Sequence, residues 1–270
     1  MVASDKLFAG SIPEIYDRFL VPLIFEPYAL DLARRLAHTA PRNVLETAAG
    51  TGVLTRAMAS ILPAEARIVA TDLNQPMLDR AALSSADGRI EWRQADALAL
   101  PFADQSFDAV ACQFGAMFFP DKVLAYKEAR RILRPGRRFL FNVWGPISDN
   151  EFADTVTDAL AVLFPQDPPR FMARTPHGYH DVQLIRQELD AAGFTAVSID
   201  TVDHRSKAPS PREPAIAYCQ GTPLRNEIET RDASGLEAAT QRATEALSRR
   251  FGTGAIEGRI QALVITASRG

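Results

Sequence analysis

The chemistry of this chain is suggested first by two glycines, Gly50 and Gly52, that follow a short apolar stretch. Glycine lets bare backbone approach a bound molecule, and Thr51 between them can cap a following helix. Amides at a helix N-terminus carry partial positive charge, so a carboxylate or phosphate is a natural ligand there. Residues 44–53 are therefore predicted to form a strand, a ligand-binding turn and the start of a helix, although an ordinary tight turn has the same pattern.

A carboxylate lies at a spacing that gives this turn a more specific meaning. Asp72 follows the apolar stretch 67–71 and comes 20 residues after Gly52. In a βαβ unit, an acidic residue at the end of the second strand faces the same crevice as the glycine turn, where it can accept hydrogen bonds from a ribose. The spacing favours a nucleoside-containing ligand over the alternative, a helix-capping or solvated loop carboxylate.

The elements that must position these residues alternate in type along the chain. Apolar stretches of strand type alternate with stretches of helical periodicity between residues 44 and 144, and strands after the first are predicted at 67–71, 90–95, 107–114 and 138–144. Two more strands are predicted at 196–202 and 259–268. Such alternation is typical of a parallel, doubly wound α/β sheet with right-handed crossovers.

Three segments fall outside this alternation. Residues 11–40 have helical spacing that Pro22 and Pro27 are expected to break into two or three pieces. The segments at about 145–180 and 205–235 are rich in proline, and the second is also rich in charge and is expected to hold loop and short helix. We expect an N-terminal helical cap over residues 1–40 and a main domain over 41–270 that carries these two segments as lid insertions.

The composition excludes several classes of protein. Of the 270 residues, 47% are hydrophobic and 23% charged, which is typical of a globular protein, and the net charge of −3 argues against a chain that coats nucleic acid. Its two cysteines, Cys112 and Cys219, form neither a disulfide framework nor a metal-ligand cluster. There is no secretory-type N-terminal pattern and no run of about 18 apolar residues. We therefore expect a cytoplasmic protein without a membrane-spanning segment.

Four segments, taken in order, resemble the class I S-adenosylmethionine-dependent methyltransferases, in the small-molecule group that includes the ubiquinone/menaquinone-biosynthesis C-methyltransferases. They are Glu46-x-Ala48-x-Gly50-Thr51-Gly52, then Asp72, then Asp96-Ala97 with Leu100-Pro101-Phe102 and Ser106-Phe107-Asp108, and finally Arg131-Ile132-Leu133-Arg134-Pro135-Gly136-Arg137. The resemblance covers about residues 40–145, and the remainder by element order. It implies a Rossmann-like, seven-stranded, mostly parallel sheet of order 3-2-1-4-5-7-6, with the last strand antiparallel, and a helical lid.

The resemblance also implies residues that bind S-adenosylmethionine and its product S-adenosylhomocysteine. Gly50 and Gly52 would line the methionine part, and Glu46 would lie near the sulfonium and amino groups. Asp72 would hold the ribose hydroxyls, and Asp96 would accept from the adenine amino group. Carboxylates are suited to this because they balance a cationic cofactor. The remaining implied members are Tyr16, which simple helix packing explains equally well, and Ala48, Leu73, Met77, Ala97, Gln113 and Phe114.

The chain departs from the family pattern at Thr47 and Ala49, where relatives often have Asp or Gly. An alanine in place of a glycine restricts the backbone. We expect Ala49 to narrow the freedom of the turn slightly without abolishing cofactor binding.

A nicotinamide-dependent oxidoreductase is the alternative from another class of chemistry. Gly50-x-Gly52-x-x-Thr55 followed by Asp72 half-matches a dinucleotide fingerprint. Thr55, however, occupies the place of the third glycine, where close helix packing favours Gly or Ala, and no Tyr-x-x-x-Lys is present. A cofactor-binding protein that has lost catalysis also stays open, because methyl transfer needs no dedicated side chain.

The acceptor is predicted to be a small, partly apolar molecule rather than a nucleic acid. The basic cluster Arg130, Arg131, Arg134, Arg137 and Arg138 is explained by a helix C-terminus and a solvated turn. The sequence after the fourth strand, Gln113-Phe114-Gly115-Ala116, lacks the Asn/Asp-Pro-Pro-Tyr/Phe element of enzymes that methylate base amino groups. We expect in-line methyl transfer to an oxygen, nitrogen or carbon, with no indication of oligomeric state.

Two histidines are weak candidates for a catalytic base. His177 and His180 lie in the expected lid segment, and an imidazole titrates near neutral pH. A metal site is disfavoured, because two histidines without a third ligand at zinc-like spacing are usually loop and cap residues.

Overall fold

The structure is a computed structural model that describes residue 5 and residues 7–270. The chain divides into two compact units. Unit 1 comprises residues 1–26, 144–179 and 203–262, and unit 2 comprises residues 27–143, 180–202 and 263–270. The expected domain division, with its cap over 1–40 and its two lid insertions, stays a prediction, and residues 1–4 and 6 of that cap lie outside the described residues.

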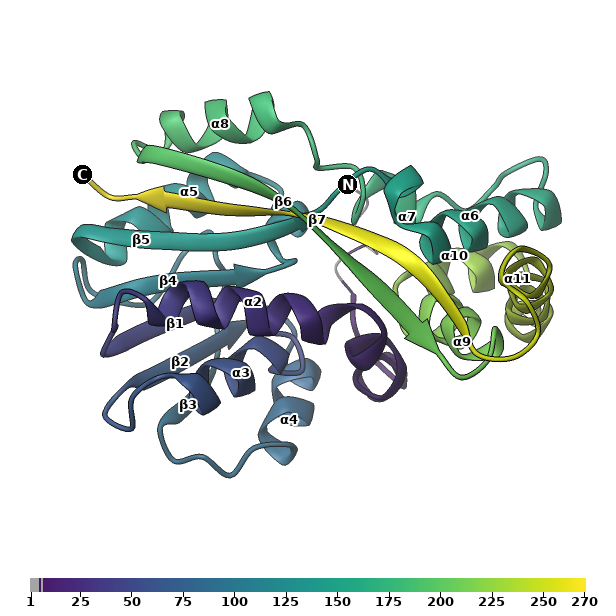
Figure 1. Ribbon diagram of the computed structural model, residues 1–270, viewed down its shortest axis with the longest axis horizontal. Helices are drawn as coiled ribbons and strands as arrows, with labels where there is room; N and C mark the ends of the chain where they lie inside the picture. The colour runs from purple at the N-terminus through teal and green to yellow at the C-terminus, as the bar shows by residue number, and fades with distance from the viewer. Residues whose placement is uncertain (1–4, 6) are drawn as a thin grey trace. The chain divides into compact units, whose positions relative to one another are not determined.

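A seven-stranded sheet of order β3-β2-β1-β4-β5-β7-β6 organises the described chain (Figure 1). This confirms the predicted strand order. Its strands are β1 (Asn43–Thr47), β2 (Arg67–Asp72), β3 (Ile90–Gln94), β4 (Phe107–Gln113), β5 (Leu133–Trp144), β6 (Thr195–Ala208) and β7 (Ile256–Ser268).

Strand direction follows from the pairing. β1 pairs in parallel with β2 and β4, β2 with β3, and β4 with β5. β7 runs antiparallel to β5, because its residue numbers fall as those of β5 rise: Gly136 N donates to Arg269 O at 2.8 Å, and Gly145 N donates to Gln261 O at 3.0 Å. The predicted antiparallel last strand is thus confirmed.

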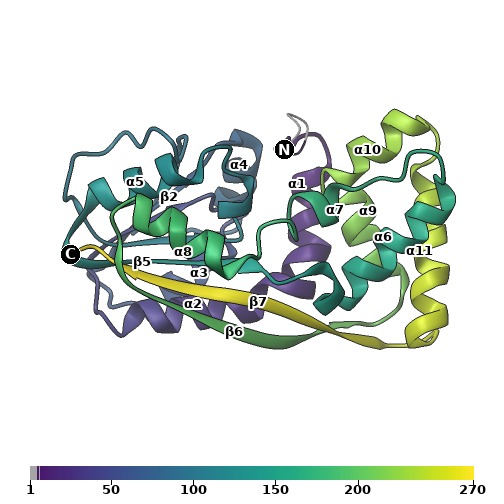
Figure 2. The same cartoon turned by 90° about the horizontal axis from the view of Figure 1, so that it is seen from above.

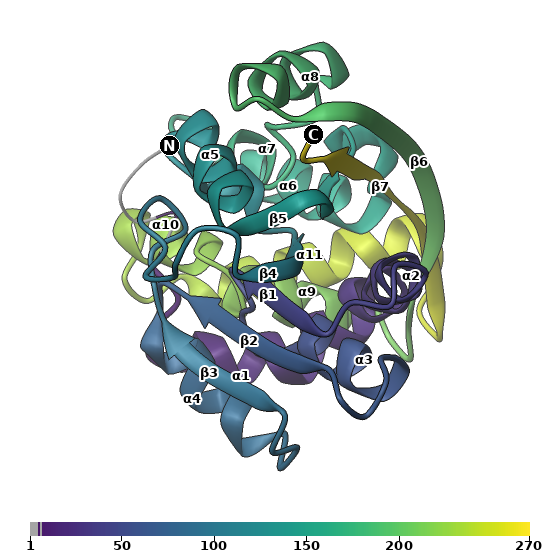
Figure 3. The same cartoon turned by 90° about the vertical axis from the view of Figure 1, so that its left-hand side faces the viewer.

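In unit 2, helices cover both faces of the sheet. Helices α2 (Glu26–Ala37) and α3 (Val53–Ile61) pack on one face, where Leu32, Leu54 and Leu140 belong to one buried cluster. Phe139 and Phe141 flank Leu140 and point to the other face, where both contact Tyr126 of α5 (Lys122–Ile132). Helix α8 (Val182–Ala191) packs against α5 on this second face. Helix α4 (Gln75–Leu83) lies instead on the face of α2 and α3, where its Ala81 and the ring of Trp92 both approach Gly52. The two helical layers are visible in Figure 3. Successive side chains of β5 point to opposite faces of the sheet, so this strand contributes to two apolar cores.

Unit 1 is largely helical. It holds α1 (Ile12–Ile15), a π-helix η2 (Tyr16–Phe25), α6 (Glu151–Leu163), α7 (Phe171–Arg174), α9 (Arg212–Gln220), α10 (Leu224–Arg231) and α11 (Leu236–Phe251). Helix α11 packs against α6 and α9, an arrangement that Figure 2 shows. Two short 3-10 turns complete the helical elements of the described chain, η4 (Ile147–Asp149) in unit 1 and η3 (Ala116–Phe118) in unit 2. No described helix is long and apolar enough to cross a membrane.

Two expectations about local structure were wrong. Pro22 and Pro27 were expected to break the N-terminal helix, but α1, η2 and α2 run without interruption. Pro22 lies inside the π-helix, whose wider hydrogen-bond spacing accommodates an inserted residue, and Pro27 lies in the first turn of α2, where a missing N–H costs little. Strand β6 also extends to Ala208, six residues past the predicted end at Val202. Periodicity does not indicate this extension.

One buried carboxylate joins the start of β1 to β4 and β5. Asp108, on β4, accepts from Arg42 N at 3.0 Å and Asn43 N at 2.9 Å, and it also pairs with the Arg134 guanidinium. Burial raises the pKa of Asp108, but the two backbone amides and Arg134 outweigh burial and leave this pKa below its usual value. The Ser106-Phe107-Asp108 segment of the motif therefore has a structural role.

Replacing Asp108 by alanine should lower the free energy of unfolding by about 2–4 kcal/mol, because the amides of Arg42 and Asn43 lose this acceptor. Urea denaturation measures the change. Asp104→Ala is the matched control, because the Asp104 side chain pairs with Arg131 but is 69% exposed, and it should cost less than about 0.5 kcal/mol. Equal losses in the two variants would contradict the role given to Asp108.

Candidate cofactor site

The glycine turn lies between the end of β1 and the start of α3, as the sequence predicts. Gly50 and Gly52 both have left-handed backbone, with φ of 56° and 81°. Gly52 is also constrained by space, because a Cβ at this position would lie 2.5 Å from the ring of Trp92 on β3. Glycine is therefore required here for both backbone conformation and close packing.

Two details of the turn differ from expectation. The N-cap of α3 is Gly52 rather than Thr51, and the hydroxyl of Thr51 is buried without a hydrogen-bond partner. The restricted position is Ala48 rather than Ala49, since Ala48 has φ of 53° whereas the backbone of Ala49 is not left-handed. A non-glycine residue in this region costs about 1 kcal/mol, so the turn stores local strain at the end of β1.

Asp72 ties the turn to the second strand. Its Oδ2 accepts from Gly50 N at 2.9 Å, and its Oδ1 accepts from Asn74 N at 2.8 Å. Asn74 occupies the N-cap of α4, but its side-chain amide donates to Asp72 at 3.3 Å and makes no capping hydrogen bond to the helix. Burial raises the pKa of Asp72, and the backbone hydrogen bonds partly offset it. The carboxylate spaced 20 residues from Gly52 thus contacts the glycine turn directly.

Glu46 is the second buried acid of the site. It is 1% exposed, and the hydroxyl of Thr55 on α3 donates to its Oε2 at 2.5 Å. Burial raises the pKa of Glu46 to about 8, against the lowering effects of Thr55 and Arg56 and with a smaller raising effect of Asp72. A buried acid with so few donors is suited to a cationic ligand group.

The loop after β3 carries Asp96 and Ala97. Asp96 is exposed and accepts from Leu98 N at 2.9 Å, and Ala97 is half-buried. Arg131 anchors the following residues, because its guanidinium donates to Leu100 O at 2.9 Å and Phe102 O at 2.7 Å. Arg131 belongs to the predicted motif, but its contacts with this loop could not be predicted from that motif.

The end of β4 is held in an unusual conformation. Phe114 has φ of 50°, and its amide donates to Asn142 Oδ1 at 3.0 Å. Its ring and that of Tyr28 meet edge to face, with centroids 5.4 Å apart. Gln113 and Phe114 are both buried. Sequence reasoning missed Tyr28 and Asn142, because neither lies in a motif and their role depends on pairing between distant segments.

Unit 2 therefore gathers most of the predicted cofactor residues at the carboxyl ends of β1 to β4 and in the segments that follow. Leu73 is exposed, whereas Met77 is buried against the sheet side of α4. These two stay predictions together with the rest of the set in this unit, which is Glu46, Ala48, Gly50, Gly52, Asp72, Asp96, Ala97, Gln113 and Phe114.

The other predicted residues are divided between the units. Tyr16, in unit 1, stacks on Phe25 at 5.1 Å and contacts the edge of Phe8. His177, also in unit 1, is buried, and its Nδ1 lies 3.0 Å from Gly145 O. His180 belongs to unit 2 and is exposed. Within the described part of the chain, His, Cys, Asp and Glu side chains form no group of three that could hold a metal ion.

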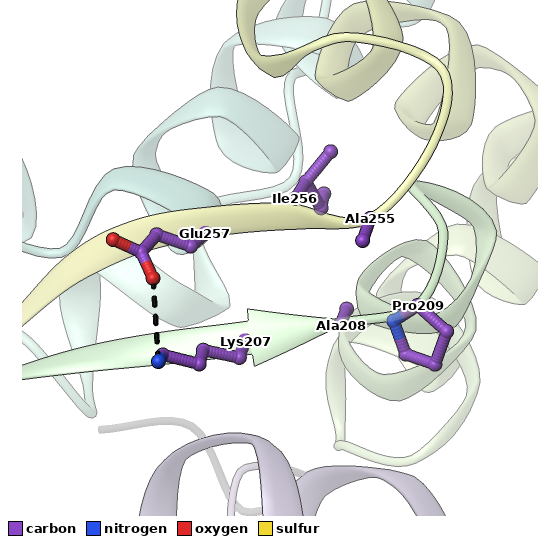
Figure 4. A pocket seen from close by; sticks show the side chains of 6 residues that line it. All are labelled: Lys207, Ala208, Pro209, Ala255, Ile256 and Glu257. Carbon is purple, nitrogen blue, oxygen red and sulfur yellow. Dashed lines mark ion pairs between the residues drawn. The ribbon is translucent and has the colours of Figure 1, made fainter.

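One open pocket of about 540 Å³ lies in unit 1, where β6 ends and β7 begins (Figure 4). Lys207 and Glu257 form an ion pair across it at 3.6 Å. Its other lining residues are Ala208, Pro209, Ala255 and Ile256, so no predicted site residue contributes to it.

Comparison with known proteins agrees with this geometry. A family described as a methyltransferase domain matches residues 45–141. The ubiquinone/menaquinone biosynthesis C-methyltransferase UbiE of Saccharophagus degradans is 30% identical over 203 residues, which cover 70% of this chain and 77% of the relative. The UbiE protein of Ectopseudomonas mendocina is 32% identical over 209 residues, covering 72% and 76%.

Solved structures share the fold at low sequence identity. A phosphoethanolamine N-methyltransferase of Haemonchus contortus in complex with S-adenosylmethionine has a TM-score of 0.61 at 15% identity, covering 100% of this chain and 60% of that chain. The YcgJ protein of Bacillus subtilis has a TM-score of 0.57 at 19% identity, covering 90% and 98%.

Glu46→Gln should stabilise the ligand-free protein at pH 8 and have little effect at pH 5. The folded-state pKa of Glu46, about 8, lies above the ordinary value of 4.5, so its stabilising contribution is complete below pH 4.5 and is lost as the pH rises through 8. For a gain of about 2 kcal/mol, the melting temperature rises by about 4–8 °C. Differential scanning fluorimetry from pH 5 to 9 measures this, with exposed Glu65→Gln as control. A stability difference independent of pH contradicts the prediction.

Proposed function

The chain belongs to the class I S-adenosylmethionine-dependent methyltransferases, and we propose that it binds this cofactor at the glycine turn of unit 2 and methylates a small, partly apolar molecule. The observation that carries the placement is the bridge from Gly50 N to Asp72 at 2.9 Å with Glu46 buried beside it. It puts two acids and a turn of bare backbone in one place.

The residues present fit the charge pattern of the cofactor. The methionine end of S-adenosylmethionine carries an ammonium, a carboxylate and a sulfonium. Glu46 accepts from the ammonium and balances the positive charge, while backbone amides of the turn donate to the carboxylate. Gly50 and Gly52 present no side chain that would block this approach.

The loops after β2 and β3 recognise the nucleoside part of the cofactor. Asp72 accepts from the ribose hydroxyls through oxygen lone pairs that its contacts with Gly50 and Asn74 leave available. Leu73, which is 46% exposed, offers an apolar surface to the adenine ring. Asp96 accepts from the adenine amino group, and Ala97 contributes its amide to the ring.

The chemistry needs alignment more than it needs a reactive side chain. When bound, S-adenosylmethionine supplies an electrophilic methyl group on a positively charged sulfur. The chain orients the two ligands and excludes water, and effective molarities reached by such alignment are worth about 7–11 kcal/mol of barrier in favourable cases. The segments at 145–180 and 205–235 and the residues around Tyr16 are proposed to supply acceptor recognition and closure.

His177 is the stronger of the two candidates for a general base. The Gly145 carbonyl can only accept, so Nδ1 of His177 carries a hydrogen, and Nε2 is the ring atom that would take a proton from the acceptor. His177 is also buried beside Trp144, with ring centroids 6.0 Å apart. Apolar surroundings of this kind suit an acceptor with an aromatic or aliphatic part, and the relatives named for quinone biosynthesis agree with that class.

The cellular setting forms part of the same proposal. Both cysteines, Cys112 and Cys219, are buried and unpaired, which agrees with a reducing cytoplasm. Three of the five arginines of the basic cluster have structural partners: Arg131 pairs with Glu128, Arg134 pairs with Asp108, and Arg130 donates to Gly193 O. They therefore offer little free charge for nucleic acid, and a small-molecule acceptor stays the favoured class.

Asp72→Asn should weaken binding of S-adenosylhomocysteine by about 10–100-fold, or about 1–3 kcal/mol, through lost charged hydrogen bonds. Isothermal titration calorimetry measures this, with circular dichroism to verify folding. Asp79→Asn, on the exposed side of α4, is the matched control and should leave affinity unchanged. The cofactor assignment is wrong if the Asp72→Asn variant is folded and binds S-adenosylhomocysteine with unchanged affinity. It is also wrong if the wild-type protein binds NADH but not S-adenosylhomocysteine.

His177→Gln should lower kcat by about 10²–10⁴-fold and leave the affinity for S-adenosylhomocysteine unchanged. Formation of S-adenosylhomocysteine is followed with a panel of phenolic, quinol, amine and carboxylate acceptors. His180→Gln tests the second candidate, and exposed His38→Gln is the control. Loss of activity in the His180 variant alone would transfer the base role to His180.

A further inference from the structure

The hydrogen bond between Thr55 and Glu46 is the shortest polar contact of the candidate site. Thr55 is fully buried in the first turn of α3, and its hydroxyl donates to Glu46 Oε2 at 2.5 Å. No Lys, Arg or His among the described residues forms an ion pair with Glu46. Thr55 is therefore its one hydrogen-bonding side chain within the described chain, and it fixes one of the two carboxyl oxygens.

Few charges surround this pair. Arg56, next to Thr55 on α3, uses its guanidinium to donate to Thr51 O at 2.6 Å. Asp72, on β2, accepts hydrogen bonds from Gly50 N, Asn74 N and the Asn74 side chain, among others. The thiol of Cys112, on β4, stays neutral because burial raises its pKa to about 12. Of the two acids, Glu46 has fewer donors to stabilise its ionised form.

We propose that Thr55 is a positioning residue that holds Glu46 for the amino group of the cofactor, and that cofactor binding expels one proton from Glu46. This inference rests on the proposed placement of the cofactor at the glycine turn. The step is balanced: the Glu46 carboxyl O–H bond breaks, its proton passes to the buffer, and the resulting carboxylate pairs with the ammonium of the ligand. Thr55 keeps donating to Oε2, so Oε1 is the oxygen that accepts from the ligand.

The acid–base properties of the site agree with this step. Burial raises the pKa of Glu46 to about 8, so the carboxyl of the ligand-free protein is mostly protonated at pH 7. Ligand binding must ionise it, and the apparent dissociation constant should then fall about tenfold for each pH unit between 6 and 8. Above pH 8 the dependence should level off, since Glu46 is already ionised.

Proton release can be counted in the unmodified protein. Calorimetric titration with S-adenosylhomocysteine at pH 7 in phosphate and in Tris, whose ionisation enthalpies differ, should show release of nearly one proton per site. Titration with 5′-methylthioadenosine, which lacks the amino-acid part, should show none. Release of no proton by the wild-type protein with S-adenosylhomocysteine would overturn the inference, whatever the variants do.

The role of Thr55 is tested by two substitutions of opposite character. Thr55→Val keeps the shape but removes the hydroxyl, so the pH at which affinity levels off should rise by about one unit and affinity at pH 7 should fall about tenfold. Thr55→Ser keeps the hydroxyl and should retain the wild-type pH profile. If Thr55 acts only by packing, Thr55→Val leaves the profile unmoved and Thr55→Ser is the weaker binder, which would overturn the positioning role.

Glu46→Gln separates failure of this inference from failure of the proposed site. If the cofactor binds elsewhere, Glu46→Gln binds S-adenosylhomocysteine with wild-type affinity at every pH. If the site is correct and the proton step is wrong, Glu46→Gln binds more weakly but the wild-type protein releases no proton. Weaker binding together with loss of a wild-type proton release supports both.

Discussion

The site depends on one buried carboxylate, that of Asp72, which accepts from amides of two different loops. Gly50 N lies 2.9 Å and Asn74 N lies 2.8 Å from its oxygens. These contacts fix the βα turn after β1 against the βα turn after β2, so the backbone amides and the acids are arranged before any ligand arrives. Such preorganisation reduces the entropy lost on binding. The Asp72 carboxylate consequently joins two loops of the fold, and the proposed function gives it a second role in recognition.

Placing acids in this position has a cost in the ligand-free protein. Burial raises the pKa values of both Glu46 and Asp72, which means that their ionised forms are disfavoured until a cation accompanies them. The left-handed backbone of Ala48 and Phe114 adds strain at the ends of β1 and β4. Backbone strain and buried acids without a cationic partner thus lie where the cofactor is proposed to bind. Asp108, near the start of β4, differs because backbone amides of the protein itself donate to it.

Much of the fold and part of the site could be predicted from the sequence, because they depend on local spacing. The alternation of strands and helices predicted the sheet. The sequence spacing between Gly52 and Asp72 predicted that the glycine turn and this carboxylate lie together at the carboxyl ends of the strands, as they do. The π-helix around Pro22, the left-handed Ala48 and the extension of β6 to Ala208 were not predictable in this way. They result from tertiary packing and hydrogen-bond register, which periodicity does not encode.

The two units differ in the chemistry they present, and this difference bears on how the acceptor is chosen. Unit 2 offers carboxylates and backbone amides, which recognise a ligand of fixed charge. Unit 1 offers aromatic rings in contact, including Tyr16 on Phe25 and Trp144 beside His177, which recognise shape and apolar area. A hydrophobic surface discriminates only weakly between molecules of similar size. Under the proposed function, substitutions in unit 1 should therefore change the acceptor and preserve the proposed cofactor contacts of Asp72 and Glu46. In the proposed function, acceptor specificity therefore depends on packing, and cofactor binding depends on charge.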